Sequence, residues 1–331
     1  MFDGKVVLIT GGTGTFGKSF TRYLLTSHKP KKIIVLSRDE FKQYEMQRSF
    51  GENSILRFFI GDVRDKERLY RAFYGVDLAV HAAASKQVVA AEYNPFEAVK
   101  TNIIGGQNVI EACIDNNVKK VVALSTDKAA NPINLYGATK LASDKLFVAA
   151  NAYAGGRVSR FCVVRYGNVL GSRGSVLPLF LEERLKGRLS ITVPEMTRFW
   201  ITLDRAIALV MKALAETQGG EIFVPKIPSM RMDDFAKTIA PEAEINIVGI
   251  RPGEKLHEVM IPADDARHSR EYNDHYRILP EFAMWSANFE GGLPLTDGFS
   301  YSSDTNPERL KPEELRRVAL QVARECGIPY E

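Results

Sequence analysis

The segment 124–140, LSTDKAANPINLYGATK, contains side chains whose types and spacing could do proton chemistry. Tyr136 and Lys140 are four residues apart, so on a helix they lie on the same face. A lysine cation beside a phenol stabilises the phenolate and lowers the tyrosine pKa from its reference value of about 10. Such a tyrosine is a base for the hydroxyl proton of a sugar or an alcohol, and the same lysine can hold the ribose of a nicotinamide cofactor.

Short runs rich in β-branched residues alternate with helical stretches along the first half of the chain. The runs are 5–10, 33–37, 56–60, 77–83, 118–125 and 158–165. Near-continuous apolar strands separated by helices predict a parallel sheet covered on both faces, so we expect an α/β fold of the doubly wound Rossmann type. The fifth run delivers residues 125–128 to the carboxyl edge of the sheet, where open α/β sheets bind their ligands.

Beyond Arg165 the alternation loosens into segments punctuated by glycine and proline, with one helical stretch at 203–216. We therefore expect two units. Residues 1–165 form a dinucleotide-binding Rossmann domain that includes the segment above. Residues 166–331 form mainly a smaller substrate-binding lobe, which is interleaved with the first domain.

The stretch VVLITGGTGTFGKSF places Gly11, Gly14 and Gly17 between the first strand and the helix that follows it. Glycines let the turn close and let the backbone approach a pyrophosphate, whose charge then meets N–H groups and the positive end of the helix dipole. The stretch lacks the Gly-Lys-Ser/Thr ending of a phosphate loop, so a dinucleotide fits better than ATP. The alternative is a turn with a structural role only. The predicted cofactor contacts in this loop are Gly11, Thr13, Gly14, Thr15, Phe16 and Gly17.

The second strand ends in LSRDE, where a Rossmann protein contacts the adenosine ribose. An acidic residue there would bind the 2′-hydroxyl of NAD, whereas Ser37 and Arg38 offer a hydroxyl and a guanidinium for the 2′-phosphate of NADP. NADP is therefore the predicted cofactor. Asp39 beside them counts against it, and a solvated charge is the alternative role for Arg38.

The next two strand ends supply further candidate contacts. The stretch GDVRD follows the third strand and could border the adenine, and three alanines follow the fourth strand with side chains small enough for a cofactor to lie against the chain. A lysine just past the alanines could touch cofactor or substrate. These candidates are Asp62, Val63, Ala82, Ala83, Ala84 and Lys86.

Composition narrows the classes of protein. The 331 residues are 45% hydrophobic and 25% charged with a net charge of +4, which is typical of a globular protein and gives little reason to expect nucleic acid or a membrane as partner. The three cysteines are far apart and lack metal-ligand spacing, so we expect a reducing, cytoplasmic location and no metal. His81 ends a buried run and is expected to be a packed residue without chemistry.

The chain resembles the extended short-chain dehydrogenases/reductases that act on nucleotide sugars. The resemblance rests on GGTGTFG, HAAASKQV, STDKAANPINLYGATK, RYGNVLGSRGSV and RPGEKLHE, and it spans essentially the whole chain. Within this family the chain is similar to the branch of inverting UDP-N-acetylglucosamine 4,6-dehydratases that opens pseudaminic acid synthesis. The resemblance implies that Thr126 lines the site, that Tyr136 and Lys140 are the catalytic pair, and that Asp127 and Lys128 perform a dehydration.

The Asp127–Lys128 pair suits that reaction chemically. Once C4 of a hexose is oxidised to a ketone, the C5 proton becomes acidic, and water can leave from C6 if one group removes that proton and another protonates the hydroxyl. Asp127 can be the acid and Lys128 the base, on the condition that neighbouring cations and burial keep some Lys128 neutral. A related retaining branch has Asp-Glu at this place. The alternative is an ion pair on an exposed turn.

The expected substrate grip follows the sixth strand, where RYGNVLGSRGSVLPLF forms a Gly-rich loop suited to a sugar and a diphosphate. The resemblance adds a cofactor contact at Val169, and nucleotide and diphosphate contacts in MTRFW and RPGEK. Guanidinium groups match diphosphate geometry. The alternatives are that the asparagine of the loop caps a turn and that the arginine of RPGEK pairs with a surface carboxylate. The predicted substrate contacts are Lys86, Asn168, Arg173, Ser175, Arg198, Arg251 and Glu254.

The sequence thus predicts a dehydratase that converts UDP-N-acetylglucosamine with inversion at C5, using a tightly bound NADP that is regenerated each turnover. The resemblance also implies a homo-oligomer such as a hexamer. Two alternatives stay open. One is a nucleotide-sugar 4-epimerase or reductase, whose product keeps its water. The other is a non-catalytic dinucleotide-sensing protein, which has no need of the complete Asp-Lys-Tyr-Lys set.

Overall fold

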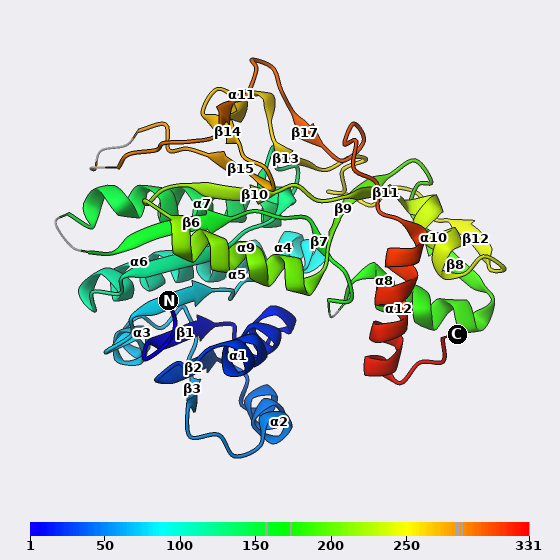
Figure 1. The fold of residues 1–331 in the computed structure, drawn as a ribbon. Helices are drawn as coiled ribbons and strands as arrows, with labels where there is room; N and C mark the ends of the chain where they lie inside the picture. The colour runs from blue at the N-terminus through cyan, green and yellow to red at the C-terminus, as the bar shows by residue number, and fades with distance from the viewer. Residues whose placement is uncertain (156–157, 173, 283–284, 286, 331) are drawn as a thin grey trace.

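A ten-stranded sheet forms the centre of the molecule in the computed structural model, which describes residues 1–155, 158–172, 174–282, 285 and 287–330 (Figure 1). Its strand order is β16-β14-β15-β10-β6-β5-β4-β1-β2-β3. The segment from β10 to β3 is parallel, whereas β15, β14 and β16 run antiparallel at one edge. The strands are β1 (Val6–Thr10), β2 (Lys32–Ser37), β3 (Leu56–Ile60), β4 (Leu78–His81), β5 (Lys120–Leu124), β6 (Arg160–Val164), β10 (Ile222–Pro225), β14 (Ser269–Glu271), β15 (His275–Ile278) and β16 (Leu293–Pro294).

The predicted α/β Rossmann architecture is confirmed. The strand order reverses at β1, because the chain builds outward through β2 and β3 and then returns to β4 on the other side of β1. Such a reversal opens a crevice at the carboxyl ends of the strands, which is where doubly wound sheets bind ligands. The central strands are apolar and almost wholly buried because helices cover both faces of the sheet.

The helices lie in two layers against this sheet (Figure 1). One layer packs α1 against α9, and the other packs α6 against both α3 and α7. Short helices α4 and α5 contact the start of α7. The helices of this unit are α1 (Thr15–Ser27), α2 (Glu40–Phe50), α3 (Lys66–Phe73), α4 (Val88–Tyr93), α5 (Pro95–Val99), α6 (Gly105–Asp115), α7 (Leu135–Tyr153), α9 (Leu203–Glu216) and α11 (Ala263–Ala266), with a π-helical turn at Lys100–Ile104.

A second lobe has its own apolar core, in which Leu177, Phe180, Trp200, Phe235 and Leu315 are fully buried. Figure 1 shows it beside the main sheet, with the last helix of the chain across it. Its elements are α8 (Val176–Glu183), β8 (Arg188–Ile191), α10 (Met232–Ile239), β12 (Glu244–Ile247) and α12 (Pro312–Cys326). Smaller sheets join the lobe to the main sheet, made of β7 (Asn168–Val169), β9 (Thr197–Ile201), β11 (Ser229–Arg231), β13 (Val259–Ile261) and β17 (Tyr301–Ser302).

The chain beyond residue 165 contributes to both units. Strands β10, β14, β15 and β16 belong to the main sheet and helix α9 packs on it, whereas α8, β8, α10, β12 and α12 build the second lobe. The packing therefore does not separate the two units at residue 165. That residues 166–331 mainly bind the substrate remains a prediction.

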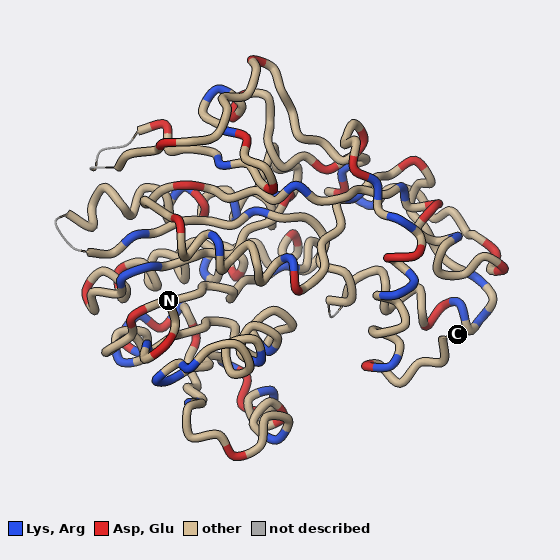
Figure 2. The backbone as a smooth tube through the Cα atoms, viewed as in Figure 1, with Lys and Arg blue, Asp and Glu red and all other residues tan. Residues whose placement is uncertain are grey.

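Charge is spread over the whole molecule. Figure 2 shows Lys and Arg interspersed with Asp and Glu along the chain in both lobes. Over the residues that the structure describes, no helix is long and apolar enough to cross a bilayer. The described part of the chain also contains no group of three or more His, Cys, Asp and Glu residues arranged to hold a metal ion.

Candidate active site

Strand β5 and the start of helix α7 converge at the carboxyl edge of the sheet. The residues after β5 form a 3₁₀ turn at Asp127–Ala129, which Thr126 caps by accepting a hydrogen bond from the Lys128 N–H at 3.3 Å. Asn134 caps α7 in the same way, accepting from the Gly137 N–H at 2.7 Å. A methyl group on Gly137 would lie 2.2 Å from the Lys128 carbonyl oxygen, so this glycine lets the helix start pack directly on the turn.

The Lys128 amine lies among oxygen atoms from three segments. Its Nζ is 3.1 Å from Asp127 Oδ1, 3.3 Å from Glu258 Oε1 and 3.5 Å from Asn168 Oδ1. Asp127 is fully buried, and its Oδ1 also accepts a hydrogen bond from the Thr126 hydroxyl at 2.9 Å. The pair is therefore a feature of the interior and not the exposed turn pair considered as the alternative.

The sequence argument required neighbouring cations and burial to keep some Lys128 neutral, and the charges around Lys128 do not meet this condition. Burial would lower the pKa of Lys128, but the Asp127 and Glu258 carboxylates outweigh burial and raise it above its usual value. Burial raises the pKa of Asp127, the Lys128 charge opposes this effect, and the Glu258 charge adds to it. The expectation that neighbouring cations hold Lys128 neutral is wrong for this geometry, because its nearest charged neighbours are carboxylates. Lys128 is an ammonium in this arrangement.

Tyr136 is buried beside this pair, and its hydroxyl shares a hydrogen bond with Thr126. Burial raises its pKa to about 12, while the Lys128 charge is the first influence that lowers it. Lys140 is directed elsewhere, since its Nζ donates to the Leu124 carbonyl oxygen at 2.8 Å. Burial lowers the Lys140 pKa, and nearby Asp144 opposes that effect. The cation that acts most strongly on the phenol is thus Lys128, whereas the sequence spacing predicts Lys140.

The glycine loop lies close to the segment after β4. Gly11 has a φ of +64°, and a methyl group there would lie 2.8 Å from the Ala83 nitrogen. At Gly17 a methyl group would lie 2.4 Å from the Gly12 carbonyl oxygen, so α1 can begin against the loop only with glycine at this position. Gly14 caps α1 without a side chain, and no acidic residue occupies the first turn. The N-terminus of α1 therefore suits an anion such as a pyrophosphate.

The other residues of the loop have packing roles that are compatible with cofactor contact. The Thr13 hydroxyl lies 2.8 Å from the Ser37 hydroxyl, which ties the loop to the end of β2. Phe16 stacks on Phe20 with ring centroids 5.5 Å apart, and Thr15 is the first residue of α1.

The end of β2 places Arg38 in solvent. Its side chain is 67% exposed, with Nη1 3.8 Å from Asp62 Oδ2. Asp39 caps α2, accepting from the Lys42 N–H at 3.0 Å and pairing with the Lys42 amine at 2.6 Å. The structure thus gives Asp39 a local structural role and leaves the Arg38 guanidinium accessible.

The segments after β3 and β4 border the same edge of the sheet. Val63 is buried and would touch a side chain on Gly105. The alanines Ala82 and Ala83 are half-buried, while Ala84 and Lys86 are exposed.

His81 has the packed role expected for it. Its Nδ1 lies 2.8 Å from the Thr10 hydroxyl, and its ring stacks on Phe147. Burial, with a contribution from Lys140, lowers its pKa to about 3, so the ring is neutral.

The predicted substrate residues fall into two groups. Asn168 in β7 contacts Lys128, and neighbouring Val169 pairs with Ile201 of β9. Buried Arg198 donates to the Thr197 and Leu256 carbonyl oxygens at 2.7 and 3.2 Å. These residues lie around the 3₁₀ turn Asp127–Ala129.

The second group lies in loops farther from Lys128. Ser175 stands at the N-cap position of α8 without a capping hydrogen bond from its side chain, and Arg173 lies outside the described residues. In the loop 251–254, the Arg251 N–H donates to a Glu254 carboxylate oxygen at 3.3 Å. This loop docks on the start of α7, because Asn134 donates to the Gly253 carbonyl oxygen at 2.8 Å.

Sequence reasoning missed Glu258 and Lys255, although both belong to the stretch RPGEKLHE on which the resemblance rests. Lys255 donates to the Ala130 carbonyl oxygen and lies 3.8 Å from Glu258. The sequence signal that could have identified Glu258 was an acidic residue at the end of a stretch that already contains other charged residues.

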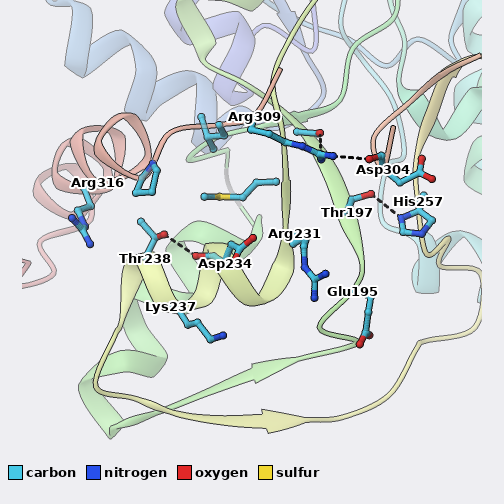
Figure 3. Close-up of a pocket in the computed structure, with 14 residues that line it drawn as sticks. Glu195, Thr197, Arg231, Asp234, Lys237, Thr238, His257, Asp304, Arg309 and Arg316 are labelled. Atoms are coloured by element: carbon cyan, nitrogen blue, oxygen red, sulfur yellow. Dashed lines mark hydrogen bonds between the residues drawn. The ribbon is translucent and has the colours of Figure 1, made fainter. Parts of the chain in front are cut away.

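A separate cavity of about 790 Å³ lies among β9, β11, α10 and α12 (Figure 3). Arg231, Lys237 and Arg309 line it together with Glu195 and Asp234, so its lining carries both signs of charge. Thr197 faces this cavity, where its hydroxyl lies 2.8 Å from His257 Nδ1. The neighbouring Arg198 points away from this cavity toward Lys128, because its Nε lies 3.9 Å from Glu258, the carboxylate that also contacts Lys128.

Several known proteins resemble this chain. A UDP-N-acetylglucosamine 4,6-dehydratase (inverting) from Campylobacter jejuni is 55% identical over 325 residues, covering 95% of this chain and 97% of the relative. A UDP-glucose 4-epimerase from Rickettsia canadensis is 38% identical over 335 residues, covering 97% of both.

Solved structures agree with the fold. Pen from Bacillus thuringiensis has a TM-score of 0.89 and 39% identity over 97% of this chain and 98% of its own. DesIV, a dTDP-glucose 4,6-dehydratase from Streptomyces venezuelae solved with NAD and TYD bound, has a TM-score of 0.69 and 25% identity over 76% and 86%. The family model described as polysaccharide biosynthesis protein matches residues 7–280. With this match, the near full-length relatives and the Rossmann fold, the chain belongs to the polysaccharide biosynthesis protein family of extended short-chain dehydrogenases/reductases.

Proposed function

We propose that this chain is a UDP-N-acetylglucosamine 4,6-dehydratase that inverts C5 of its substrate. The observation that carries the proposal is the contact between buried Asp127 and half-buried Lys128, next to Tyr136. An alcohol oxidoreductase needs a base such as Tyr136, but only an elimination also needs an acid and a base for a second position of the sugar. The Campylobacter jejuni relative has this activity by name.

The residues divide the reaction between them. Tyr136 takes the proton of the C4 hydroxyl as that carbon is oxidised. Lys128 then removes the proton from C5, and Asp127 protonates the C6 hydroxyl so that it leaves as water. Hydride is then returned to C6 and C5 takes up a proton on the opposite face, so the expected product is UDP-2-acetamido-2,6-dideoxy-β-L-arabino-hex-4-ulose.

The proton count of the pair is compatible with these roles. When both groups are charged, the pair is an Asp127 carboxylate and a Lys128 ammonium, whereas the elimination needs a carboxylic acid and an amine. These two states contain the same number of protons. One proton transfer along the 3.1 Å contact from Lys128 Nζ to Asp127 Oδ1 converts the first into the second.

A nicotinamide dinucleotide fits the glycine loop, and when bound it would accept hydride from C4 and return it to C6. The glycine loop with Gly11 and Gly17, the N-terminus of α1 and the small residues after β4 would hold it. DesIV, with the same fold, was solved with NAD. Tyr136 stands at the carboxyl edge of the same sheet, which is where the reacting end of the cofactor should lie.

The decisive test is the mass of the product. Incubation with UDP-N-acetylglucosamine should give a UDP-sugar lighter by one water, and its proton NMR spectrum should show an inverted C5. A product of unchanged mass with altered configuration at C4 would instead favour the second candidate, a 4-epimerase, which the Rickettsia canadensis relative supports by its name. Recovery of substrate alone would leave a non-catalytic role.

We also propose NADP as the cofactor, because the accessible Arg38 guanidinium lies beside Ser37 at the end of β2 while Asp39 is engaged in capping α2. Arg38→Ala should weaken NADP binding much more than NAD binding, since only the 2′-phosphate loses a bidentate partner. Titration calorimetry with both cofactors measures this difference. The exposed Arg48→Ala variant is a matched control, and equal loss for both cofactors would exclude NADP selection by Arg38.

The family resemblance supports two further proposals, that the product enters pseudaminic acid-type nonulosonate synthesis and that the chain forms a homo-oligomer such as a hexamer. The widely separated cysteines support a third, that the chain acts in the cytoplasm.

A further inference from the structure

Glu258 is a buried carboxylate at the centre of a cluster of cations. It immediately precedes β13, it is 1% exposed, and its oxygens lie 3.3 Å from Lys128 Nζ, 3.9 Å from Arg198 Nε and 3.8 Å from Lys255 Nζ. Its backbone is fixed from both sides, because its N–H donates to the Ser303 hydroxyl at 2.9 Å and its carbonyl oxygen accepts from the Ser303 N–H at 2.8 Å. A buried charge is costly unless it is paired, so this placement requires the surrounding cations.

The surroundings of Lys128 match an ammonium ion. An ammonium has three N–H donors, and three oxygens, those of Asp127, Glu258 and Asn168, lie 3.1 to 3.5 Å from Nζ. Glu258 comes from a segment 130 residues away in sequence, and Asn168 comes from a different strand. The amine is thereby held in one position next to Asp127, its partner in the elimination.

We propose that Glu258 is a positioning residue of the dehydration, which holds the Lys128 amine against Asp127 and sets the pH range in which the Asp127–Lys128 pair contains a single proton. The inference rests on the proposed function, because it concerns the acid and base of that elimination. It adds a second acidic group to the Asp-Lys pair, and this group acts through Lys128 without touching the reacting atoms.

The direction of the effect follows from charge. The pair is active with one proton, so activity falls when it gains a second proton at low pH and when it loses its last proton at high pH. A neighbouring carboxylate makes protons harder to remove at both steps. The titratable or charged groups around Glu258 and this pair, taken from every element packed there, are Asp127 and Lys128 of the 3₁₀ turn, Tyr136 of α7, Arg165 after β6, Arg198 of β9 and Lys255 before β13.

Glu258→Gln keeps the shape of the side chain and removes its charge. We expect both limbs of the kcat/KM profile for water loss to move to lower pH, by about one unit or more, as is usual for a charge within about 4–6 Å. Glu258→Asp draws the carboxylate back by one methylene, so both limbs should move in the same direction by less. Glu52→Gln removes an exposed carboxylate from a loop and should leave both limbs in place.

The profile is measured by mass spectrometry of the product, and circular dichroism at each pH confirms that each variant is folded. The inference would be overturned if the parent enzyme releases water and the pH profile of Glu258→Gln has both limbs at the same pH as the parent profile. If Glu258→Gln does not fold, Glu258→Asp decides, and parent limb positions in that variant would overturn it equally. A parent enzyme that releases no water would contradict the proposed function instead, so the two failures are distinguishable.

Discussion

Lys128→Ala should oxidise C4 of the substrate and then stop before water is lost. Tyr136 and Lys140 remain in this variant, so the first step keeps its base, whereas C5 has lost the group that removes its proton. Loss of a general base typically slows a step by about 10²–10⁴-fold, and we expect water loss to fall by that factor. In a single turnover with stoichiometric enzyme, NADPH absorbance should rise and persist, whereas in the parent it should be transient.

The structure adds a second consequence of this substitution. Because the Lys128 charge lowers the pKa of Tyr136, removing it should raise that pKa further above about 12. A Tyr136 phenolate then requires a higher pH, so C4 oxidation by the variant should speed up as pH rises, over a range displaced upward from the parent's. Stopped-flow absorbance at several pH values measures this displacement.

Deuterated water separates the two roles that Lys128 could have. The parent should place deuterium at C5, and Lys128→Ala should return mostly unlabelled substrate. Lys145→Ala, on the exposed side of α7, is the matched control and should behave as the parent does. Dehydrated and C5-labelled product from Lys128→Ala at close to the parent rate would show that another group takes the proton.

Tyr136→Phe should block the reaction one step earlier. The phenyl ring keeps the buried packing, but the hydroxyl that shares a hydrogen bond with Thr126 and accepts the C4 proton is lost. We expect hydride transfer from C4 to fall by about 10²–10⁴-fold, so that NADPH absorbance no longer rises in a single turnover. Substrate binding should change little, because the predicted sugar and nucleotide contacts are intact.

Tyr166→Phe is the control for loss of a buried hydroxyl close to the site. Tyr166 contacts the 3₁₀ turn Asp127–Ala129 through its backbone, since its carbonyl oxygen accepts a hydrogen bond from the Asp127 N–H at 3.1 Å. That hydrogen bond survives the substitution, so turnover should stay within a few-fold of the parent. Near-normal turnover by Tyr136→Phe would remove this tyrosine from the mechanism.

The sequence by itself determined the architecture and the core of the site. Apolar runs at regular intervals can be buried only in a parallel sheet with helices on both faces, and the glycine loop after the first run can lie only at the carboxyl edge. The turn that contains Asp127 and Lys128 follows a strand of that sheet directly, and Tyr136 begins the next helix. These positions depend on local order along the chain, so the residue pattern was sufficient to predict them.

Tertiary structure alone decided what surrounds those residues. Glu258 reaches Lys128 through a loop that crosses from the second lobe, and no periodic pattern in the sequence predicts this contact. The same is true of Lys140, whose amine is taken up by the Leu124 carbonyl oxygen, so that Lys128 is the cation with the strongest effect on the phenol. Protonation follows from burial and from charges brought together over long distances in sequence. For that reason the sequence predicted an acid and a base at this place, but only the folded chain showed that the Lys128 amine lies between Asp127 and Glu258, which raise its pKa.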